Sequence, residues 1–476
     1  MKITLRLKTL LLSFILVTGV SVADVVAVSN GNDYFGQWQN GLATDENHFP
    51  IAVWLQSPGR AQSYKNIGIN LYIGLWQGPT ETQLNQLEAA NMAVICNQNQ
   101  YALDNLQRYQ ETIVGWMYID EPDNAQKWDG SDEWGRCYLP SELVDIYNDI
   151  VANDPTRPVY VNFGQGVVEG TGYLGRWYLD EAHLGPGNDY SGENYSRYYT
   201  EASEAADILS FDIYPIASGY GSENLWYVGQ GISNLKNWSL EEKPTWCWIE
   251  TTRINGTIKP TTEQVRAEVW MAIINGATGI GYFCHEFNPS FNEDALLDDI
   301  EMREAVAAIN QEVQNIAPVL NSRLSDNSLS ITVTTDGQTG VTVLTRFYQD
   351  QLYFFTINGQ ETTLNATFTL DGLENPDSEV EVIGENRSIT CSNGLFTDSF
   401  SAYEIHRYRI DHTIPPRAGD VNDDGDIGLD DLVWALQVVS NQPTSETVHE
   451  KADASGDGRL GLAEAISILK KLGMPE

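Results

Sequence analysis

Two glutamates are the residues of this sequence best suited to chemistry. Glu121 ends the apolar segment GWMYIDE, and Glu250 ends the apolar segment TWCWIE. An ionised carboxylate at the end of such a segment is costly unless it faces a cavity or a partner. Two carboxylates that face one another can cleave a glycosidic bond, one as proton donor and the other as nucleophile or base. We predict that Glu121 and Glu250 form this pair; an ion pair of Glu250 with Arg253 is the structural alternative.

Eight apolar, β-rich segments, separated by helix-like stretches, would position these side chains. The segments are Phe49–Gln56, Ile69–Trp76, Met92–Asn97, Ile113–Ile119, Pro158–Phe163, Ile208–Tyr214, Thr245–Glu250 and Gly279–His285. Near-continuous apolar strands that alternate with helices indicate a parallel sheet covered on its faces. Eight units over roughly 270 residues have the size of a (β/α)8 TIM barrel. A doubly wound open sheet is the runner-up, but no G-x-G-x-x-G turn follows the first strand.

Polar and aromatic residues stand at the ends of these segments. In a barrel, catalytic and binding residues lie where strands end. We therefore predict that the following residues bind substrate: Trp54, Trp76, Asn97, Asp120, Asn162, Asp212, Tyr214, Trp248, His285 and Glu286. Carboxylates and indoles at one mouth suit a sugar, although indoles also fill cores. A supporting role is the alternative for each residue, and Glu286 is a rival for the catalytic pair.

Short motifs in the barrel segment resemble clan A of the glycoside hydrolases. WIET at Trp248–Thr251 is similar to the nucleophile strand of the β-galactosidase-like families, and FDIYP at Phe211–Pro215 is similar to a segment of their sixth strand. The resemblance implies that Glu250 is the nucleophile and Glu121 the acid/base of a retaining double displacement. The clan usually has asparagine before the acid/base, where it binds the sugar 2-hydroxyl, but this sequence has Asp120.

This assignment makes predictions about geometry. The two carboxyl groups of a retaining enzyme lie about 5–5.5 Å apart. The pKa of Glu121 is expected to be raised by burial and by the charge of Glu250, to which Asp120 would add. Tyr214 is expected to hold Glu250 by a hydrogen bond. No cofactor is expected for catalysis, since the sequence contains no P-loop pattern.

Residues 321–411 change to alternating strands with Asp-Gly and Asn-Gly turns. This pattern predicts an antiparallel β-sandwich. Its function would be either carbohydrate binding or stabilisation of the barrel, and we favour stabilisation. A Pro-containing linker, residues 412–418, follows the sandwich.

Two twelve-residue acidic loops near the C-terminus have the calcium-loop pattern. Oxygen ligands occupy positions 1, 3, 5, 7 and 12, with glycine at position 6. The predicted ligands are Asp420, Asn422, Asp424, Asp426, Asp431, Asp453, Ser455, Asp457, Arg459 and Glu464, with position 7 binding through its backbone carbonyl. The alternative is a pair of acidic turns.

A helix-like run follows each acidic loop, and no helix enters either one. This arrangement of residues 419–476 resembles a type I dockerin. The resemblance implies two structural Ca²⁺ ions and docking onto a cohesin-type scaffold protein. A calcium-stabilised tail without a partner is the alternative.

Composition and the N-terminus narrow the function classes. Acidic residues outnumber basic ones 66 to 27, and a net charge of −39 opposes nucleic-acid binding. Residues 1–23 have the basic start, apolar run and small-residue end of a signal peptide, which predicts a secreted, extracellular protein. No other segment is expected to span a membrane. The five cysteines predict either a single bridge, between Cys96 and Cys137, or five buried thiols.

We therefore predict a secreted, retaining glycoside hydrolase that acts on a poly- or oligosaccharide, with its barrel in residues 33–320. The alternative is a non-catalytic carbohydrate-binding or scaffold-attached protein with a decayed barrel. A hydrolase with a serine nucleophile is disfavoured because the sequence has no G-x-S-x-G motif.

Overall fold

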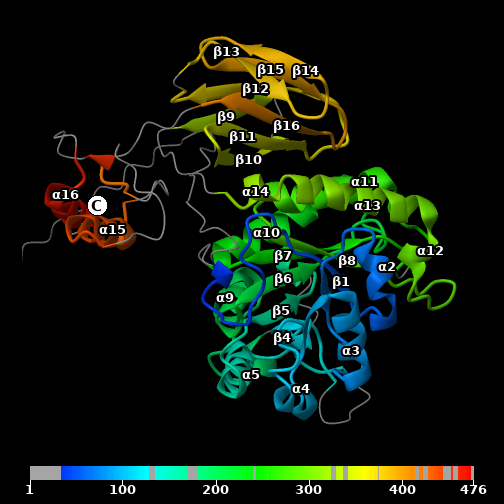
Figure 1. The fold of residues 1–476 in the computed structure, drawn as a ribbon. Helices are drawn as coiled ribbons and strands as arrows, with labels where there is room; N and C mark the ends of the chain where they lie inside the picture. The colour runs from blue at the N-terminus through cyan, green and yellow to red at the C-terminus, as the bar shows by residue number, and fades with distance from the viewer. Residues whose placement is uncertain are drawn as a thin grey trace, which may run out of the picture.

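The computed structural model describes residues 34–472 except 128–133, 170–179, 240–242, 255, 323–328, 336–340, 374, 413–417, 422–426, 443–451 and 454–458. Figure 1 shows three parts along the chain: a barrel, a pair of β-sheets and a C-terminal helix pair. The predicted signal peptide lies outside the described residues, as do the central residues of both acidic loops.

The eight apolar segments form a closed barrel of parallel strands in chain order. The strands are β1 (Ile51–Trp54), β2 (Leu71–Ile73), β3 (Ala93–Asn97), β4 (Ile113–Asp120), β5 (Val159–Phe163), β6 (Ile208–Asp212), β7 (Thr245–Glu250) and β8 (Gly279–Phe283). Closure through the pairing of β1 with β8 confirms the predicted TIM barrel and excludes the open sheet.

Helices lie outside the strands (Figure 1). They are α2 (Ala61–Lys65), α3 (Glu81–Ala90), α4 (Gln100–Asp104), α5 (Pro140–Asn153), α6 (Gly166–Glu169), α8 (Glu181–Leu184), α9 (Tyr195–Ala202), α10 (Tyr227–Trp238), α11 (Thr262–Ile274), α12 (Ala295–Asp298), α13 (Ile300–Asn315) and α14 (Ala317–Leu320). The N-cap of α11 is Thr261, whose hydroxyl accepts a hydrogen bond from the Gln264 amide and so satisfies a free donor of the first turn.

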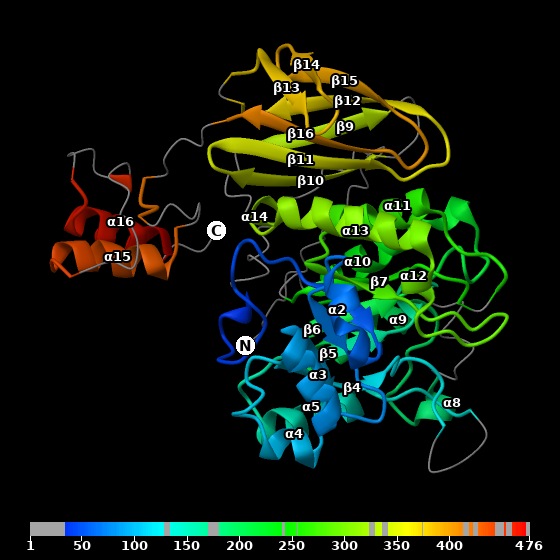
Figure 2. The ribbon, with the colours of Figure 1, turned by 45° about the vertical axis from the view of Figure 1, so that its right-hand side comes forward.

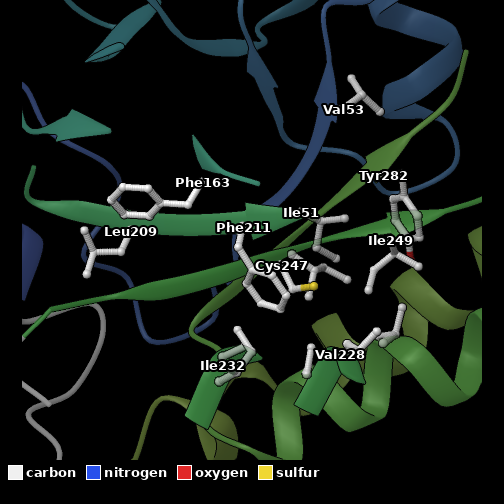
Figure 3. Packing of buried hydrophobic residues seen from close by; sticks show 14 of the residues in the cluster. Ile51, Val53, Phe163, Leu209, Phe211, Val228, Ile232, Cys247, Ile249 and Tyr282 are labelled. Atoms are coloured by element: carbon white, nitrogen blue, oxygen red, sulfur yellow. The ribbon is translucent and has the colours of Figure 1, made fainter. Parts of the chain in front are cut away.

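Alternation along β7 divides its side chains between two cores. Cys247 and Ile249 point outward, into the apolar layer between strands and helices that Figure 3 shows. Trp246 and Trp248 point inward and fill the barrel. The neighbouring strand provides space for them, because a Cβ atom at Gly281 would lie 2.3 Å from the Trp248 ring. The glycines of β8 therefore let large indoles pack inside the barrel.

Two antiparallel sheets follow the barrel, as predicted. The first contains, in spatial order, β10 (Val341–Tyr348), β11 (Gln351–Asn358), β16 (Ile405–Asp411), β13 (Ser378–Val382) and β14 (Arg387–Cys391). The second contains β15 (Leu395–Phe400), β12 (Leu364–Asp371) and β9 (Ser330–Thr335). Aromatic rings fill the space between the sheets; those of Phe368 and Phe396 stack with their centroids 4.6 Å apart.

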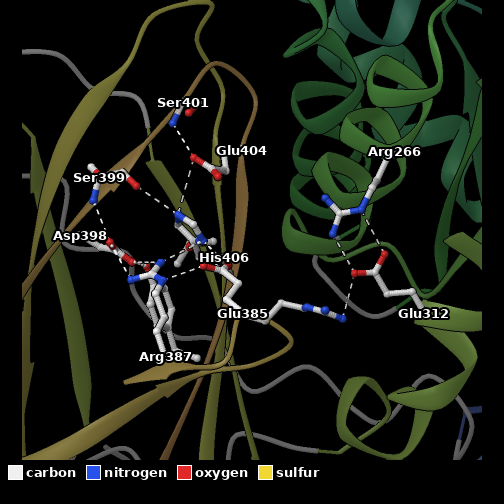
Figure 4. A network of polar contacts seen from close by, with 12 residues as sticks. Arg266, Glu312, Glu385, Arg387, Asp398, Ser399, Ser401, Glu404 and His406 are labelled. Atoms are coloured by element: carbon white, nitrogen blue, oxygen red, sulfur yellow. Dashed lines mark hydrogen bonds and ion pairs between the residues drawn. The ribbon is translucent and has the colours of Figure 1, made fainter. Parts of the chain in front are cut away.

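The first sheet packs on the barrel helices α11, α13 and α14 (Figures 1 and 2). Phe355 points away from the sandwich core and stacks on Trp270 of α11, with centroids 5.8 Å apart. Beside this contact, Glu312 of α13 binds Arg266 of α11 at 2.8 Å and Arg407 of β16 at 2.9 Å (Figure 4). Apolar and ionic contacts thus join the two parts, which agrees with a stabilising role for the sandwich.

The described C-terminal residues form α15 (Leu429–Val439) and α16 (Leu462–Leu472). These helices pack through a small apolar cluster that contains Leu432, Ala435 and Ile468. None of the described helices is long and apolar enough to cross a membrane. All five cysteines are buried free thiols, so the alternative of a Cys96–Cys137 bridge is wrong.

Candidate active site

A cavity of about 330 Å³ opens at the carboxyl ends of the barrel strands, within the usual size range of ligand pockets. Its lining residues are Trp54, Asp120, Glu121, Asn124, Asn162, Gln165, Asp212, Ile213, Tyr214, Ser218, Trp248, Ile254, Phe283 and Phe287. Among the residues that the structure describes, the lining contains carboxylates, amides and aromatic rings, and no lysine or arginine. Seven residues predicted from the sequence meet here: Trp54, Asp120, Glu121, Asn162, Asp212, Tyr214 and Trp248.

Glu121 follows β4 on a strained backbone. Its φ is +43°, in the left-handed region that residues other than glycine seldom adopt. The conformation is held because the Glu121 amide donates to the Asn162 carbonyl at 2.8 Å and the Glu121 carbonyl accepts from the Asn124 amide at 3.0 Å. Gly164 makes room for the side chain, since a Cβ atom there would lie 2.8 Å from Glu121 Oε1. Strain of this kind is typical of functional sites.

The carboxyl groups of Glu121 and Asp212 are within hydrogen-bonding reach of one another. Burial, and then the charges of Asp120 and Asp123, raises the pKa of Glu121 to about 7. Burial and the charge of Glu121 raise the pKa of Asp212 well above its ordinary value. Two carboxyl groups in contact cannot both ionise easily, so the raised pKa values favour a pair that holds one proton. The pair therefore offers one acid and one base.

A chain of hydrogen bonds crosses the barrel interior and ends on Asp120. Trp248 Nε1 donates to Tyr160 OH at 2.8 Å, and Tyr160 OH is 2.5 Å from Ser210 Oγ. Ser210 Oγ donates to Asn162 Oδ1 at 2.7 Å, and Asn162 Nδ2 donates to Asp120 Oδ1 at 3.1 Å. Every donor in the chain can point toward Asp120, which orients this carboxylate and favours its charged form.

Replacing Tyr160 with phenylalanine is expected to break this chain in the middle. The buried Trp248 N–H would lose its acceptor, which costs roughly 1–3 kcal/mol of stability, and Asp120 would be less well oriented. We expect a lower melting temperature and a several-fold lower kcat. Tyr118→Phe is the matched control, because Tyr118 OH donates to the Ala205 carbonyl outside the cavity lining. An equal fall of kcat in both variants would contradict a role for the chain.

Glu250 ends β7 but does not line the cavity. Its side chain is fully buried, and its two oxygens accept hydrogen bonds from the amides of Ile216 at 2.7 Å and Ala217 at 2.6 Å. The carboxyl of Glu268, on α11, approaches it from the helix layer. The expected contact with Tyr214 is not formed, because Tyr214 OH donates to Asp212 Oδ2 at 3.1 Å. Glu250 thus anchors the loop after β6, and its predicted catalytic role needs a rearrangement of these contacts.

Four predicted binding residues lie outside the cavity lining: Trp76, Asn97, His285 and Glu286. Trp76 is 71% exposed. Asn97 donates to the Tyr118 carbonyl at 3.2 Å and so supports the barrel wall. Burial lowers the pKa of His285 to about 4, so this ring is neutral. Glu286 pairs with Arg253 at 3.1 Å, which makes Glu286, and not Glu250, the partner of this arginine.

Four residues that contribute to the site were missed from the sequence. Tyr160 and Ser210 lie inside the barrel and were read only as parts of apolar strands. Asp123 accepts hydrogen bonds from the Gly164 amide and from Tyr199 OH, both at 2.8 Å, and so fixes the loops after β4 and β5. Gly164 could have been predicted, because a glycine directly after an apolar strand often marks a place where another group approaches the backbone closely.

The sequence matches no protein-family profile and no curated protein. Several solved structures are similar in fold. AmyP in complex with maltose has 9% identity and a TM-score of 0.45, covering 80% of this chain and 98% of that one. A catalytic mutant of Gan42B, a glycoside hydrolase family 42 β-galactosidase from G. stearothermophilus, has 8% identity and a TM-score of 0.47. The match covers 76% of this chain and 98% of Gan42B. A family 30 endoxylanase of Clostridium papyrosolvens has 12% identity and a TM-score of 0.38, covering 77% and 96%.

Proposed function

We propose that this protein is a glycoside hydrolase and that Glu121 is its proton donor. The observation that carries the proposal is the contact of Glu121 with Asp212 in the cavity at the barrel mouth, where burial and the charges of neighbouring carboxylates raise the pKa of both carboxyl groups. Cleavage of a glycosidic bond needs an acid for the departing oxygen and a carboxylate beside the anomeric carbon. With a pKa raised to about 7, roughly half of the Glu121 groups hold their proton at pH 7, and the group is acidic enough to donate it.

We propose Asp212 as the second carboxylate, and a double displacement as the mechanism. Asp212 lines the cavity and touches Glu121, whereas Glu250 is covered by two amide donors. The reactive form would be the pair with its proton on Glu121 and with Asp212 ionised, although the raised pKa of Asp212 limits the population of this form. In this form Asp212 would attack the anomeric carbon while Glu121 protonates the leaving oxygen. Glu121, now ionised, would then take a proton from the water that releases Asp212. Glu250 as nucleophile, the prediction from the sequence, is the alternative.

The test is release of reducing ends from a panel of neutral and acidic poly- and oligosaccharides, comparing the mature protein with Glu121→Gln. Cleavage of one glycan class by the protein, and its loss in the variant, would support the proposal. Binding of a glycan without cleavage would instead favour the non-catalytic carbohydrate-binding protein. N-terminal sequencing of the protein from the culture medium tests secretion, and the expected first residue is Asp24.

We further propose that the C-terminal residues bind two structural Ca²⁺ ions. Three predicted ligands within the described residues, Asp420, Asp431 and Glu464, are at most 4% exposed. Asp431 also accepts the Val421 amide at 2.6 Å and the Gly428 amide at 2.7 Å, which fixes the carboxylate at the end of its loop. Buried carboxylates are costly without a cation nearby, and an all-oxygen set suits Ca²⁺. The other predicted ligands, apart from Asp453 and Arg459, lie outside the described residues.

Chelation is expected to unfold this C-terminal part selectively. When free Ca²⁺ is at 100 times the Kd, binding stabilises the folded state by about 2.7 kcal/mol per site. EDTA should therefore lower the temperature of the first calorimetric transition of the full chain, and added Ca²⁺ should restore it. Asp420→Asn, which removes a ligand of the first loop only, should weaken this response. Asp430→Asn, at a position of the loop that supplies no ligand, should keep it. A transition that EDTA does not move would refute the calcium sites.

We propose that the C-terminal residues bind a cohesin-type scaffold protein. Each helix carries exposed apolar residues at matching positions: Leu429, Val433, Leu436 and Val439 on α15, and Leu462, Ile466, Leu469 and Leu472 on α16. Contiguous exposed apolar surface of this kind marks interaction sites. Binding to a cohesin panel in Ca²⁺, lost in Leu429→Asp, tests the proposal.

A further inference from the structure

Two exposed phenylalanines stand beside the cavity on the segment that follows β8. Phe287 is 47% exposed and Phe291 is 61% exposed, and their ring centroids are 5.5 Å apart. Aromatic rings usually lose exposed area on folding, so a pair left in water at the mouth of a ligand pocket indicates a binding surface.

Polar contacts hold this segment in a defined shape. Glu286 and Asn292 exchange backbone hydrogen bonds of 3.0 and 2.8 Å, which close the segment between them into a short loop. Arg253 binds the Glu286 carboxylate through two nitrogens, both at 3.1 Å. Asn288 Nδ2 donates to the Gly256 carbonyl at 2.8 Å. The loop is therefore fixed to the segment after β7, and its rings are presented to solvent in a fixed arrangement, which lowers the entropy cost of binding.

The two rings continue the aromatic wall of the cavity. Phe283 and Phe287 both line the cavity, with their centroids 6.4 Å apart. Phe291 contacts Phe287 and lies outside the lining. His285 contacts both rings, with its centroid 6.2 Å from that of Phe287 and 5.5 Å from that of Phe291. A cavity of about 330 Å³ holds a small ligand or one end of a longer one. A longer ligand that leaves the cavity on this side would pass over Phe291.

We propose that Phe287 and Phe291 form an outer sugar-binding subsite, and that the substrate is a neutral glycan chain. This inference rests on the proposed glycoside hydrolase function. The apolar C–H face of a pyranose ring can pack against the apolar face of an aromatic ring. A neutral chain is indicated because the described residues that line the cavity include Asp120, Glu121 and Asp212 and no lysine or arginine. Carboxylated or sulfated sugars need cationic partners, and the net charge of −39 repels them.

The experiment measures kcat/KM along a length series of neutral oligosaccharides of the class that the protein cleaves. In Phe291→Ala, the ratio of kcat/KM for long over short members is expected to fall roughly five- to tenfold, the effect of one lost aromatic contact. Phe291→Trp should restore the ratio. Leu395→Ala, which removes a 45% exposed apolar side chain from the sandwich, is the control and should not change it. An unchanged ratio in Phe291→Ala would overturn the subsite.

Calorimetric binding to Glu121→Gln protein separates this inference from the proposed function. The same series is titrated into Glu121→Gln with and without Phe291→Ala, so that no turnover is needed. A length-dependent loss of affinity would support the subsite even if the protein cleaved none of the glycans, an outcome that would refute only the hydrolase. Equal loss for short and long members, or tighter binding of anionic than of neutral chains, would overturn the inference.

Discussion

Glu121→Gln is expected to reduce hydrolysis of unactivated substrates by roughly 100- to 10,000-fold, the usual contribution of a general acid. Glutamine has nearly the same volume and fits the space beside Gly164, but it cannot supply a proton. The loss should be much smaller for aryl glycosides with acidic phenols, because such leaving groups depart without protonation. Steady-state kinetics on both substrate types measures this difference, and an equal loss on both would contradict the role of proton donor.

The pH profile is a second readout of the same residue. Because the pKa of Glu121 is raised to about 7, the donor is protonated below this pH and is lost as the pH rises through it. The wild-type rate on unactivated substrates should therefore fall above about pH 7, and this limb should be absent from the residual rate of Glu121→Gln.

The raised pKa of Glu121 should also make the stability of the folded protein depend on pH in a defined direction. A carboxyl group with a raised pKa in the folded state binds its proton more tightly there than in the unfolded chain. Stability is then highest below the ordinary pKa of glutamate and falls as the pH rises toward 7. Glu121→Gln should melt at a higher temperature than the wild type above pH 7.

Glu142→Gln is the control for Glu121→Gln. A hydrogen bond from Arg136 lowers the pKa of Glu142, so its stabilising effect is present above the ordinary pKa of glutamate and is lost as the pH falls. The control should therefore be less stable than the wild type near pH 7, with unchanged kcat. A Glu121→Gln variant that melts below the wild type at this pH would contradict the burial of an acid at this position.

Asp212→Gly and Glu250→Gly are expected to differ in whether azide restores their turnover. Removal of a nucleophile should cost at least about 1,000-fold in kcat, and added azide should then restore turnover by forming a glycosyl azide of inverted configuration. We expect azide rescue for Asp212→Gly. Product analysis by nuclear magnetic resonance and mass spectrometry measures the rescue.

Glu250→Gly should act mainly on stability. The variant leaves the amides of Ile216 and Ala217 without acceptors, at a cost of roughly 1–3 kcal/mol for each buried group. The loop that these amides belong to follows Asp212 and Tyr214, so some activity should also be lost. Azide should not restore it. Rescue of Glu250→Gly by azide, with none for Asp212→Gly, would assign the nucleophile to Glu250.

Glu268→Gln complements this comparison. Glu268 is fully buried, and burial together with the charge of Glu250 raises its pKa well above the ordinary value. The raised pKa favours the protonated form of Glu268 beside the Glu250 carboxylate. Glutamine keeps the volume and a donor group, so the variant should fold and retain activity if Glu250 is a loop anchor.

The sequence by itself determined the barrel and most of its mouth. Eight apolar segments separated by helices leave few alternatives to a closed parallel sheet, and strand ends then face one side by geometry. This is why seven predicted residues, Glu121 and Asp212 among them, line one cavity. The antiparallel sheets were also predictable, because alternation along a strand is a local property.

Only the tertiary structure decided which carboxylates share the cavity. Glu250 is bound by amides more than thirty residues earlier in the chain, and their position depends on the path of the loop after β6. Asp212 meets Glu121 because β4 and β6 are held by β5 at a fixed spacing, and because the left-handed turn at Glu121 directs its side chain. Loop paths depend on contacts between distant segments, which strand periodicity does not encode. For this reason the residue types of the site could be predicted from the sequence, but the pairing of its acids could not.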